Sequence, residues 1–187
     1  MRELSLHILD IVQNSITAGA SEITVEIAED ISANSLKISI IDNGCGMDEE
    51  TLARVNGTFA SSRTTRKIGM GIALFRAAAE LSDGQLVLTS QKGVGTSTVA
   101  TVRHDSIDRM PLGDISGTMM LLSAKAHNFD LIYRHIWRDS EFVFSTKDIK
   151  EVLEDSPIDS PEVLQYIQEY IHENLTELFG GERDEIS

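Results

Sequence analysis

The sequence predicts an α+β fold, because two hydrophobic periods follow one another along its first half. Alternating apolar residues, which indicate half-buried strands, pair as two hairpins, residues 23–28 with 36–41 and residues 85–90 with 96–102. Apolar residues at helical spacing occupy residues 2–18 and 72–81. A sheet that buries one face needs a second layer against it, so we expect helices to cover one face of the paired hairpins.

The first helix is expected to end at Gly19 and to carry one narrow polar stripe. Its polar residues step by four, three, four and three positions, which places them on one line of the helix surface: Glu3, His7, Asp10, Asn14 and Thr17. Such a stripe is usually the solvent face of an amphipathic helix. Within it, His7 is most simply interpreted as a surface histidine.

The later elements are predicted from their boundary signals. The acids at residues 48–50 should start a short helix to about Val55, and residues 58–68 lack any period and predict a mobile loop. The C-terminal part predicts three helices and a hairpin: a helix from Asp114 to about Ala126, strands 130–137 and 141–145, a helix from Lys147, and a last helix capped by Ser160 and opened by Pro161. We divide the chain into residues 1–103 and an acidic C-terminal region, residues 104–187.

Composition narrows the class of protein. The 187 residues are 41% hydrophobic and 25% charged, which is typical of a globular protein, and no apolar run reaches the ~20 residues of a membrane span. The net charge of −14, of which residues 139–187 contribute −11, argues against nucleic-acid or anionic-membrane binding. The single cysteine, Cys45, excludes an internal disulfide. We expect a cytoplasmic protein.

The segment Ile41–Met47, Ile-Asp-Asn-Gly-Cys-Gly-Met, is the first candidate site. An apolar strand ends there in one carboxylate, Asp42, followed by glycines at alternate positions. Glycine lacks a Cβ atom and lets the backbone turn sharply and approach a flat ligand closely. Taken alone, the segment is equally typical of an ordinary turn between a strand and a helix.

A second candidate site lies where the 58–68 loop meets a helix. No acid occurs between Thr51 and Ala79, whereas five bases do: Arg54, Arg63, Arg66, Lys67 and Arg76. The loop leads into Gly69-Met70-Gly71 and an alanine-rich helix. Backbone amides, a helix dipole and fixed positive charges are the parts of a phosphate site, although neither the P-loop nor the dinucleotide pattern fits.

Taken in order, four motifs connect these sites: Asp-x-x-x-Asn on the first helix, Asp-x-Gly-x-Gly after a hairpin, a basic loop into Gly-x-Gly, and Gly93-x-Gly95-Thr96 in the second hairpin. This order resembles the ATPase superfamily of DNA gyrase, the heat-shock chaperone, histidine kinases and mismatch-repair ATPases, over roughly residues 2–103. Residues 9–21 are most similar to the mismatch-repair and gyrase form, and residues 61–71 to histidine kinases. The resemblance implies a two-layer α/β sandwich of the Bergerat type, with a mixed, mostly antiparallel sheet, helices on one face, and a small α/β C-terminal extension.

The resemblance also implies ligands, ATP and Mg²⁺, and a role for each motif residue. Asp42 would accept a hydrogen bond from the adenine amino group, Met47 would pack on the ring, and Thr96 would support Asp42 through its hydroxyl or a water. Asn14 matches the family's magnesium ligand. The other residues would approach the base or bind the phosphates: Gly44, Gly46, Arg63, Arg66, Lys67, Gly69 and Gly71.

Asp10 determines which reaction is expected. It stands where gyrase-like ATPases and anti-sigma kinases place a glutamate general base and where typical histidine kinases have an amide, although aspartate is one methylene shorter. The leading hypothesis is a Mg-dependent protein that hydrolyses ATP or phosphorylates a partner protein, as anti-sigma kinases do. Two alternatives stay open: a histidine kinase subunit acting on another chain, and a non-catalytic, ATP-gated interaction module. A protein partner is expected, and a homodimer is allowed.

Overall fold

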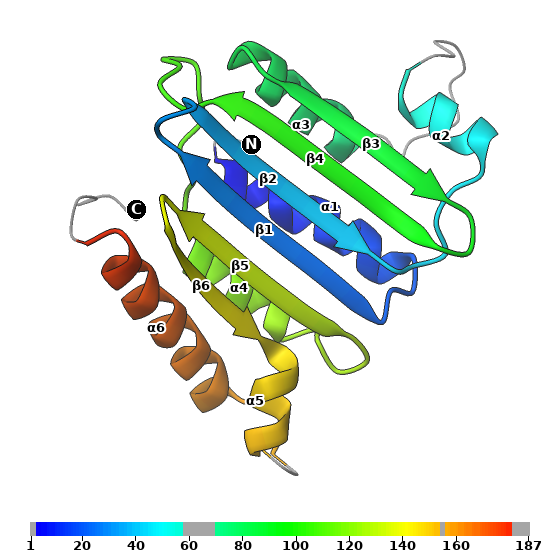
Figure 1. Ribbon diagram of the computed structural model, residues 1–187. Helices are drawn as coiled ribbons and strands as arrows, with labels where there is room; N and C mark the ends of the chain where they lie inside the picture. Colours follow the sequence, from blue (N-terminus) through cyan, green and yellow to red (C-terminus); the bar gives the residue numbers. More distant parts are fainter. Residues whose placement is uncertain (1–2, 58–69, 154–155, 181–187) are drawn as a thin grey trace.

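A computed structural model describes residues 3–57, 70–153 and 156–180 of the chain, and these residues build one mixed six-stranded sheet (Figure 1). Its strand order is β3-β4-β2-β1-β5-β6. All neighbouring strands are antiparallel except β1 and β5, which are parallel. The strands are β1 (Glu22–Asp30), β2 (Ser35–Asp42), β3 (Gln85–Gln91), β4 (Gly95–Arg103), β5 (Asp130–Trp137) and β6 (Ser140–Ser145).

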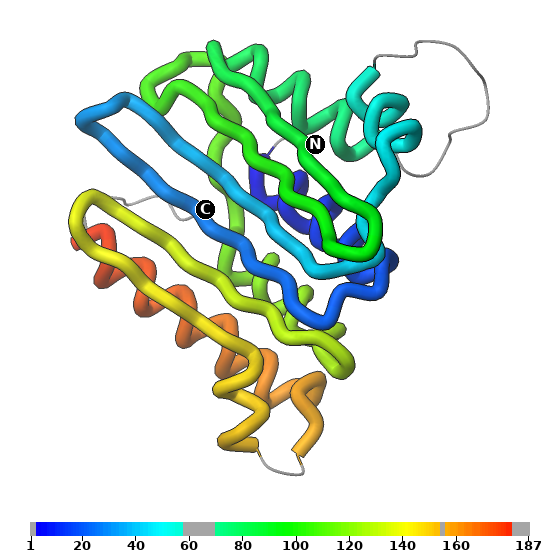
Figure 2. Tube along the Cα trace, turned by 45° about the vertical axis from the view of Figure 1, so that its right-hand side comes forward, coloured from blue at the N-terminus to red at the C-terminus, as the bar shows by residue number. Residues whose placement is uncertain are grey.

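The helices confirm the two-layer arrangement, because α1, α3 and α4 lie together on one face of the sheet (Figures 1 and 2). Within this layer, α1 contacts both α3 and α4, and α6 packs against α4 and β6. The described helices are α1 (Leu4–Thr17), α2 (Glu49–Val55), α3 (Met70–Leu81), α4 (Ile115–Ser123), α5 (Thr146–Leu153) and α6 (Pro161–Leu178). None of the helices in these described ranges has the length and apolar character that crossing a membrane requires.

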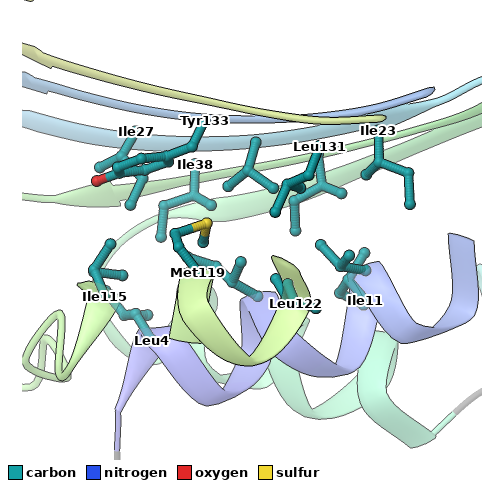
Figure 3. Close-up of a cluster of buried hydrophobic side chains, with 14 of the residues drawn as sticks. Leu4, Ile11, Ile23, Ile27, Ile38, Ile115, Met119, Leu122, Leu131 and Tyr133 are labelled. Carbon is teal, nitrogen blue, oxygen red and sulfur yellow. The ribbon is translucent and has the colours of Figure 1, made fainter. Parts of the chain in front are cut away.

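The core lies between the sheet and this helical layer. Figure 3 shows side chains of β1, β2 and β5 pointing toward those of α1 and α4. Alternate residues of β1 share one face, so Ile23, Val25 and Ile27 are completely buried against the helices. The opposite face carries a line of ion pairs across four strands, from Lys37 through Glu26 and Arg134 to Glu141, which suits a face turned to solvent.

Most predicted elements are confirmed to within a few residues, and two details differ. The helix that Asp114 caps, through Gly117 N–H at 2.7 Å, ends at Ser123 rather than Ala126. Ser160 precedes the last helix as predicted, but its side chain makes no capping hydrogen bond. The predicted loop 58–68 and the acidic end after Gly180 lie outside the described residues.

The C-terminal part of the chain adds to the same sheet rather than forming another. After β4 the chain passes through α4 and returns as β5, which pairs with β1 along eight residues, from Glu22 opposite Asp130 to Glu29 opposite Trp137. The buried side chains Ile115, Met119 and Leu122 of α4 belong to the common core. Whether residues 104–187 form a separate folding unit therefore stays a prediction to be tested.

Candidate functional site

A pocket of about 310 Å³ opens at the end of the sheet where β2 finishes. Three parts of the chain that are distant in sequence meet there: the second half of α1, the loop after β2, and the adjacent ends of α3 and β4. The lining residues are Ile11, Asn14, Ser15, Thr17, Ala18, Asp42, Cys45, Gly46, Met47, Thr51, Ile72, Thr96 and Thr98. Five of the predicted site residues therefore share one cavity: Asn14, Asp42, Gly46, Met47 and Thr96.

Asp42 is the buried carboxylate of this pocket. It continues the series Leu36, Ile38 and Ile40 on the helix-covered face of β2, because alternate residues of a strand share a face. Its side chain is 9% exposed. One carboxylate oxygen accepts a hydrogen bond from Ser15 Oγ at 2.5 Å, and the other accepts one from the Gly44 amide at 2.9 Å. Donors on both oxygens hold the carboxylate in one orientation in the wall of the pocket.

Ser15 is a site residue that the sequence analysis missed. The signal was its position: it lies on the apolar face of α1, one turn after Ile11, where a polar side chain needs a buried partner. The sequence pointed instead to Thr96 as the support of Asp42. Thr96 does pair with Asp42 across β2 and β4, but its hydroxyl hydrogen-bonds Ser90 Oγ at 2.9 Å, and the direct partner of Asp42 is Ser15.

The loop after Asp42 is clamped between α1 and the β3–β4 hairpin. Its Cys45 amide donates to Ala18 O at 2.9 Å, and its Cys45 carbonyl accepts from the Gly93 amide at 2.8 Å. The next turn is fixed by the Met47 amide, which donates to Ser90 Oγ at 2.8 Å. These bonds give the pocket a rigid wall before any ligand arrives.

Gly44 and Gly46 are required by this clamp. Gly46 has φ of +61°, and a Cβ there would lie 2.0 Å from the Gln91 carbonyl oxygen. A Cβ on Gly44, which is buried, would lie 2.9 Å from the Ala18 Cβ. The close approach that the sequence indicated is thus, at these two positions, an approach to neighbouring protein as well as to the pocket.

Asp10 and Gly71 meet at the start of α3. Asp10 is exposed on α1, and its Oδ2 atom occupies the space where a Cβ on Gly71 would be, 1.8 Å from that position. Asn14 lies one turn further along α1 and lines the pocket, as does Ile72 next to Gly71. The two residues of the Asp-x-x-x-Asn motif therefore lie beside the first turn of α3, as a phosphate site there would need.

His7 is buried, and its interpretation as a surface histidine is wrong. It is 2% exposed, and its ring stacks on Phe75 of α3 with centroids 5.0 Å apart and planes 12° apart. Neither ring nitrogen has a hydrogen-bond partner within the described ranges. Burial lowers the pKa of His7, and the charge of Asp10 opposes that shift in part. The end of the polar stripe turns toward α3, which explains the burial.

The predicted phosphate-binding bases are divided between described and undescribed segments. Arg63, Arg66, Lys67 and Gly69 lie outside the described residues. Arg54 pairs with Glu50 one turn away at 3.8 Å, on the surface of α2. Arg76 donates to Asn56 Oδ1 at 2.7 Å and so ties α3 to the end of α2. These two arginines are therefore engaged with α2 and do not line the pocket.

The donor chemistry of the pocket fits a purine nucleotide. One buried, oriented carboxylate faces a cavity with the apolar walls Ile11, Met47 and Ile72, an arrangement that suits a flat ring with an amino group. In the described part of the chain, no three His, Cys, Asp or Glu side chains gather as a metal site. The single amide oxygen of Asn14 fits Mg²⁺, which keeps several waters and is held largely by substrate phosphates.

A two-layer α/β sandwich with such a pocket at the end of its central strands defines a nucleotide-binding domain. Residues 2–106 match the sequence family described as histidine kinase-, DNA gyrase B-, and HSP90-like ATPases. The chain belongs to this family.

Curated relatives include both kinases and a repair protein. The chain is 39% identical over 108 residues to the sensor protein kinase FleS of Pseudomonas aeruginosa, covering 58% of this chain and 26% of that protein. It is 32% identical over 108 residues to the non-motile and phage-resistance protein of Caulobacter vibrioides, covering 52% of this chain and 13% of that protein. The DNA mismatch repair protein MutL of Chlorobaculum tepidum is 29% identical over 112 residues, with 59% and 15% covered. The chain thus spans 13% to 26% of the length of these relatives.

A solved structure confirms the fold. The N-terminal domain of a DNA repair protein superposes with a TM-score of 0.51 over 84% of this chain and 59% of that chain, at 16% sequence identity. The likeness extends beyond the residues that match the family, and so includes part of the C-terminal addition to the sheet.

Proposed function

We propose that the chain binds Mg-ATP in the pocket beside Asp42 and transfers the γ-phosphate to water or to a hydroxyl group of a partner protein. The observation that carries this proposal is the placement of two carboxylates with different surroundings around one pocket. Asp42 is buried and fully hydrogen-bonded, whereas Asp10 is exposed at the first turn of α3. Membership of the ATPase family supports ATP as the nucleotide.

Recognition of the base rests on Asp42. Its oxygens already accept one hydrogen bond each, and a carboxylate oxygen has lone pairs for a further donor such as the adenine amino group. Guanine presents a carbonyl oxygen at the equivalent ring position, so an acceptor there would repel it. Ile11, Met47 and Ile72 would cover the faces of the ring.

Binding of the phosphates is assigned to the start of α3 and to Asn14. The amides of the first helical turn are unpaired donors at the positive end of the helix dipole. Mg²⁺ held at Asn14 would neutralise part of the phosphate charge. The loop residues Arg63, Arg66 and Lys67, together with Gly69, are proposed as further phosphate contacts.

Asp10 is proposed as the general base. Its carboxylate is exposed, lies beside α3 and stands one turn from Asn14, so it can accept a proton from a water or hydroxyl that enters from solvent. A proton acceptor at this point serves either an ATPase or a kinase acting on a hydroxyl, because both abstract a proton from the attacking oxygen.

A second candidate function is phosphorylation of a histidine on another chain. The 39% identity to a sensor protein kinase favours it. The chemical stability of the product distinguishes the two, because a phosphohistidine is labile to acid whereas a phosphoserine or phosphothreonine is stable to it.

The decisive experiment follows both the nucleotide and its γ-phosphate. Cys45 is exposed, lines the pocket and is the sole cysteine of the chain, so its alkylation rate reports occupancy directly. We expect Mg-ATP to protect Cys45 in the wild type and in the Glu26→Gln control, whose side chain lies on the opposite face of the sheet. Asp42→Asn should abolish protection, because its amide would set a donor against the adenine amino group.

Labelled γ-phosphate then separates the reactions. Asp10→Asn should keep Cys45 protection and lose turnover by about 100-fold or more. Equal turnover in wild type and Asp10→Asn would contradict the role of Asp10. Protection with no transfer to water or protein would instead favour an ATP-gated interaction module.

A further inference from the structure

A second group of buried polar side chains lies at the other end of the sheet from the pocket. Glu29 stands near the end of β1, Tyr133 and His135 lie on β5, and His104 follows β4. Tyr133 OH is 2.6 Å from His135 Nδ1, and His135 Nε2 is 3.0 Å from Glu29 Oε1. His104 Nε2 is 3.0 Å from the other oxygen, Glu29 Oε2. We call these four residues the Glu29 network.

The network is closed off from water. Glu29 is 2% exposed and His135 and Tyr133 are completely buried, while the His104 side chain is 18% exposed. The ring of Phe179, just after α6, packs edge-on against His135 with centroids 5.2 Å apart and against Trp137 at the same distance. Phe142 of β6 packs against Tyr133 in the same manner at 6.2 Å. The network therefore forms the floor on which the end of α6 rests.

One assignment of protons satisfies every bond within the network. Tyr133 O–H donates to Nδ1 of a neutral His135, His135 Nε2–H donates to Glu29, and His104 Nε2–H donates to the second oxygen of the ionised Glu29. Burial, and then the charge of Glu29, raise the pKa of Tyr133 well above its usual value, which keeps the phenol a donor. The network is complete only while Glu29 is ionised and His135 is neutral.

We propose that the Glu29 network is an acid-released latch that holds the β5–β6 hairpin and the end of α6 against the ATP-binding part of the chain. The residues joined support this role, because Glu29 and His104 lie within the family-matched residues 2–106, whereas Tyr133, His135 and Phe179 lie beyond them. The latch is thus built across the junction between the family fold and its C-terminal addition.

Acid opens the latch because an added proton leaves two donors facing each other. A proton on His135 Nδ1 removes the acceptor of the Tyr133 hydroxyl, and a proton on Glu29 removes an acceptor of a histidine N–H. A buried donor without an acceptor is costly. Two further cations lie near the network in the described ranges: Arg109 donates to the His104 carbonyl at 2.7 Å, and Arg138 lies over Trp137 at 5.3 Å. The charged side chains of α6 and β6 are on the outer surface and do not face it.

Hydrogen exchange at two pH values tests the proposal. We would compare protection factors, corrected for the intrinsic effect of pH, between pH 7.5 and pH 5 for α6 and β6, with α3 as the internal reference. In the wild type, we expect protection of α6 and β6 to fall about tenfold or more at pH 5, since each pK unit of tighter proton binding in the open form is worth a factor of ten. Protection of α3 should stay constant.

Matched variants separate the latch from general acid sensitivity. Glu29→Gln should show low protection of α6 at both pH values, whereas Glu26→Gln, three residues earlier and on the solvent face, should behave as wild type. Wild-type protection of α6 that is equal at pH 7.5 and pH 5 would overturn the proposal, as would a Glu29→Gln variant that responds to pH like the wild type.

A measurement on the wild type covers the case in which Glu29→Gln does not fold. Nitrogen NMR of the imidazoles should find His135 protonated on Nε2 alone at pH 7.5, and should find proton uptake within the same pH interval in which α6 loses protection. Uptake outside that interval, or Nδ1 protonation of His135 at pH 7.5, would overturn the latch. These readouts do not depend on nucleotide, so failure of the proposed ATP function would leave them unchanged.

Discussion

The two ends of the helix-covered sheet face both finish in a buried carboxylate, yet they differ in what surrounds it. Asp42 closes β2 and Glu29 closes the core-facing series of β1, and because the two strands are antiparallel the carboxylates lie roughly 20 Å apart. Small donors, Ser15 and the Gly44 amide, hold Asp42 and leave a cavity of about 310 Å³ beside it. Large aromatic rings hold Glu29 and leave no such space.

The size of the hydrogen-bond donors explains this difference. A hydroxyl and a backbone amide satisfy a carboxylate without filling the volume around it, so a ligand can take the remaining lone pairs. Two imidazoles satisfy the carboxylate and fill the volume, which makes the site structural. The same residue type at the end of a strand thus serves recognition in one place and cohesion in the other.

The largest effect is expected from removing the Glu29 end altogether. A chain truncated after residue 106 keeps the family-matched residues, but it exposes the β1 edge and deprives Glu29 of His135. We expect the loss to exceed the ~5–15 kcal/mol that holds a domain together. Circular dichroism should show no cooperative unfolding, whereas a cooperative transition that retains ATP binding would establish residues 1–103 as an independent domain.

A glycine substitution should separate backbone strain from collision at the pocket end. Gly46→Ala combines a positive φ with a Cβ 2.0 Å from a carbonyl oxygen, and we expect it to cost about 2–4 kcal/mol in unfolding free energy. Gly93→Ala is the matched control, because its φ is +79° but a Cβ there meets nothing within 4 Å. Denaturant unfolding should show a cost of only about 1 kcal/mol for Gly93→Ala. Equal costs would mean that the loop yields easily.

Ser15→Ala should test whether a small donor is what orients Asp42. Removing a hydrogen bond to a charged group costs about 1.5–3 kcal/mol, so we expect affinity for ATP to fall by about tenfold or more. Ser82→Ala removes a similarly buried hydroxyl that donates to the Ala78 carbonyl, away from the pocket. Calorimetric titration should find ATP affinity unchanged in that control, and unchanged affinity in Ser15→Ala as well would argue against the role of Ser15.

The smallest effect concerns His7 and the pH dependence of stability. Burial lowers the folded-state pKa of His7 below the ordinary value of 6.5, so the unfolded chain binds the proton more readily. Stability is therefore fully present above pH 6.5 and declines as the pH falls toward the folded-state pKa, at no more than about 1.4 kcal/mol per pH unit.

His7→Phe keeps the stacking on Phe75 and removes the titrating group. Urea unfolding between pH 7.5 and pH 5 should give a shallower pH dependence for this variant than for the wild type. The part that remains should belong to the Glu29 network and should disappear in Glu29→Gln. An unchanged slope in His7→Phe would show that the buried ring does not titrate in this range.

The sequence by itself determined the local features of this protein. Periods of two and 3.6 located the strands and helices, since a side chain's face depends only on its neighbours along the chain. The glycine spacing after Asp42 and the Asp-x-x-x-Asn spacing on α1 are local in the same sense. They sufficed for the fold class, for the family and for the set of pocket residues that includes Asn14, Asp42 and Met47.

Only the tertiary structure decided the features that join distant segments. Ser15 meets Asp42 across 27 positions, Tyr133 and His135 reach Glu29 through the pairing of β5 with β1, and His7 is buried because α3 packs on its side of α1. No local period contains these contacts, because each depends on how helices and strands pack after they form. For that reason the sequence predicted the carboxylate that faces the ligand, and the structure was needed to find what holds it and what holds its counterpart at the other end of the sheet.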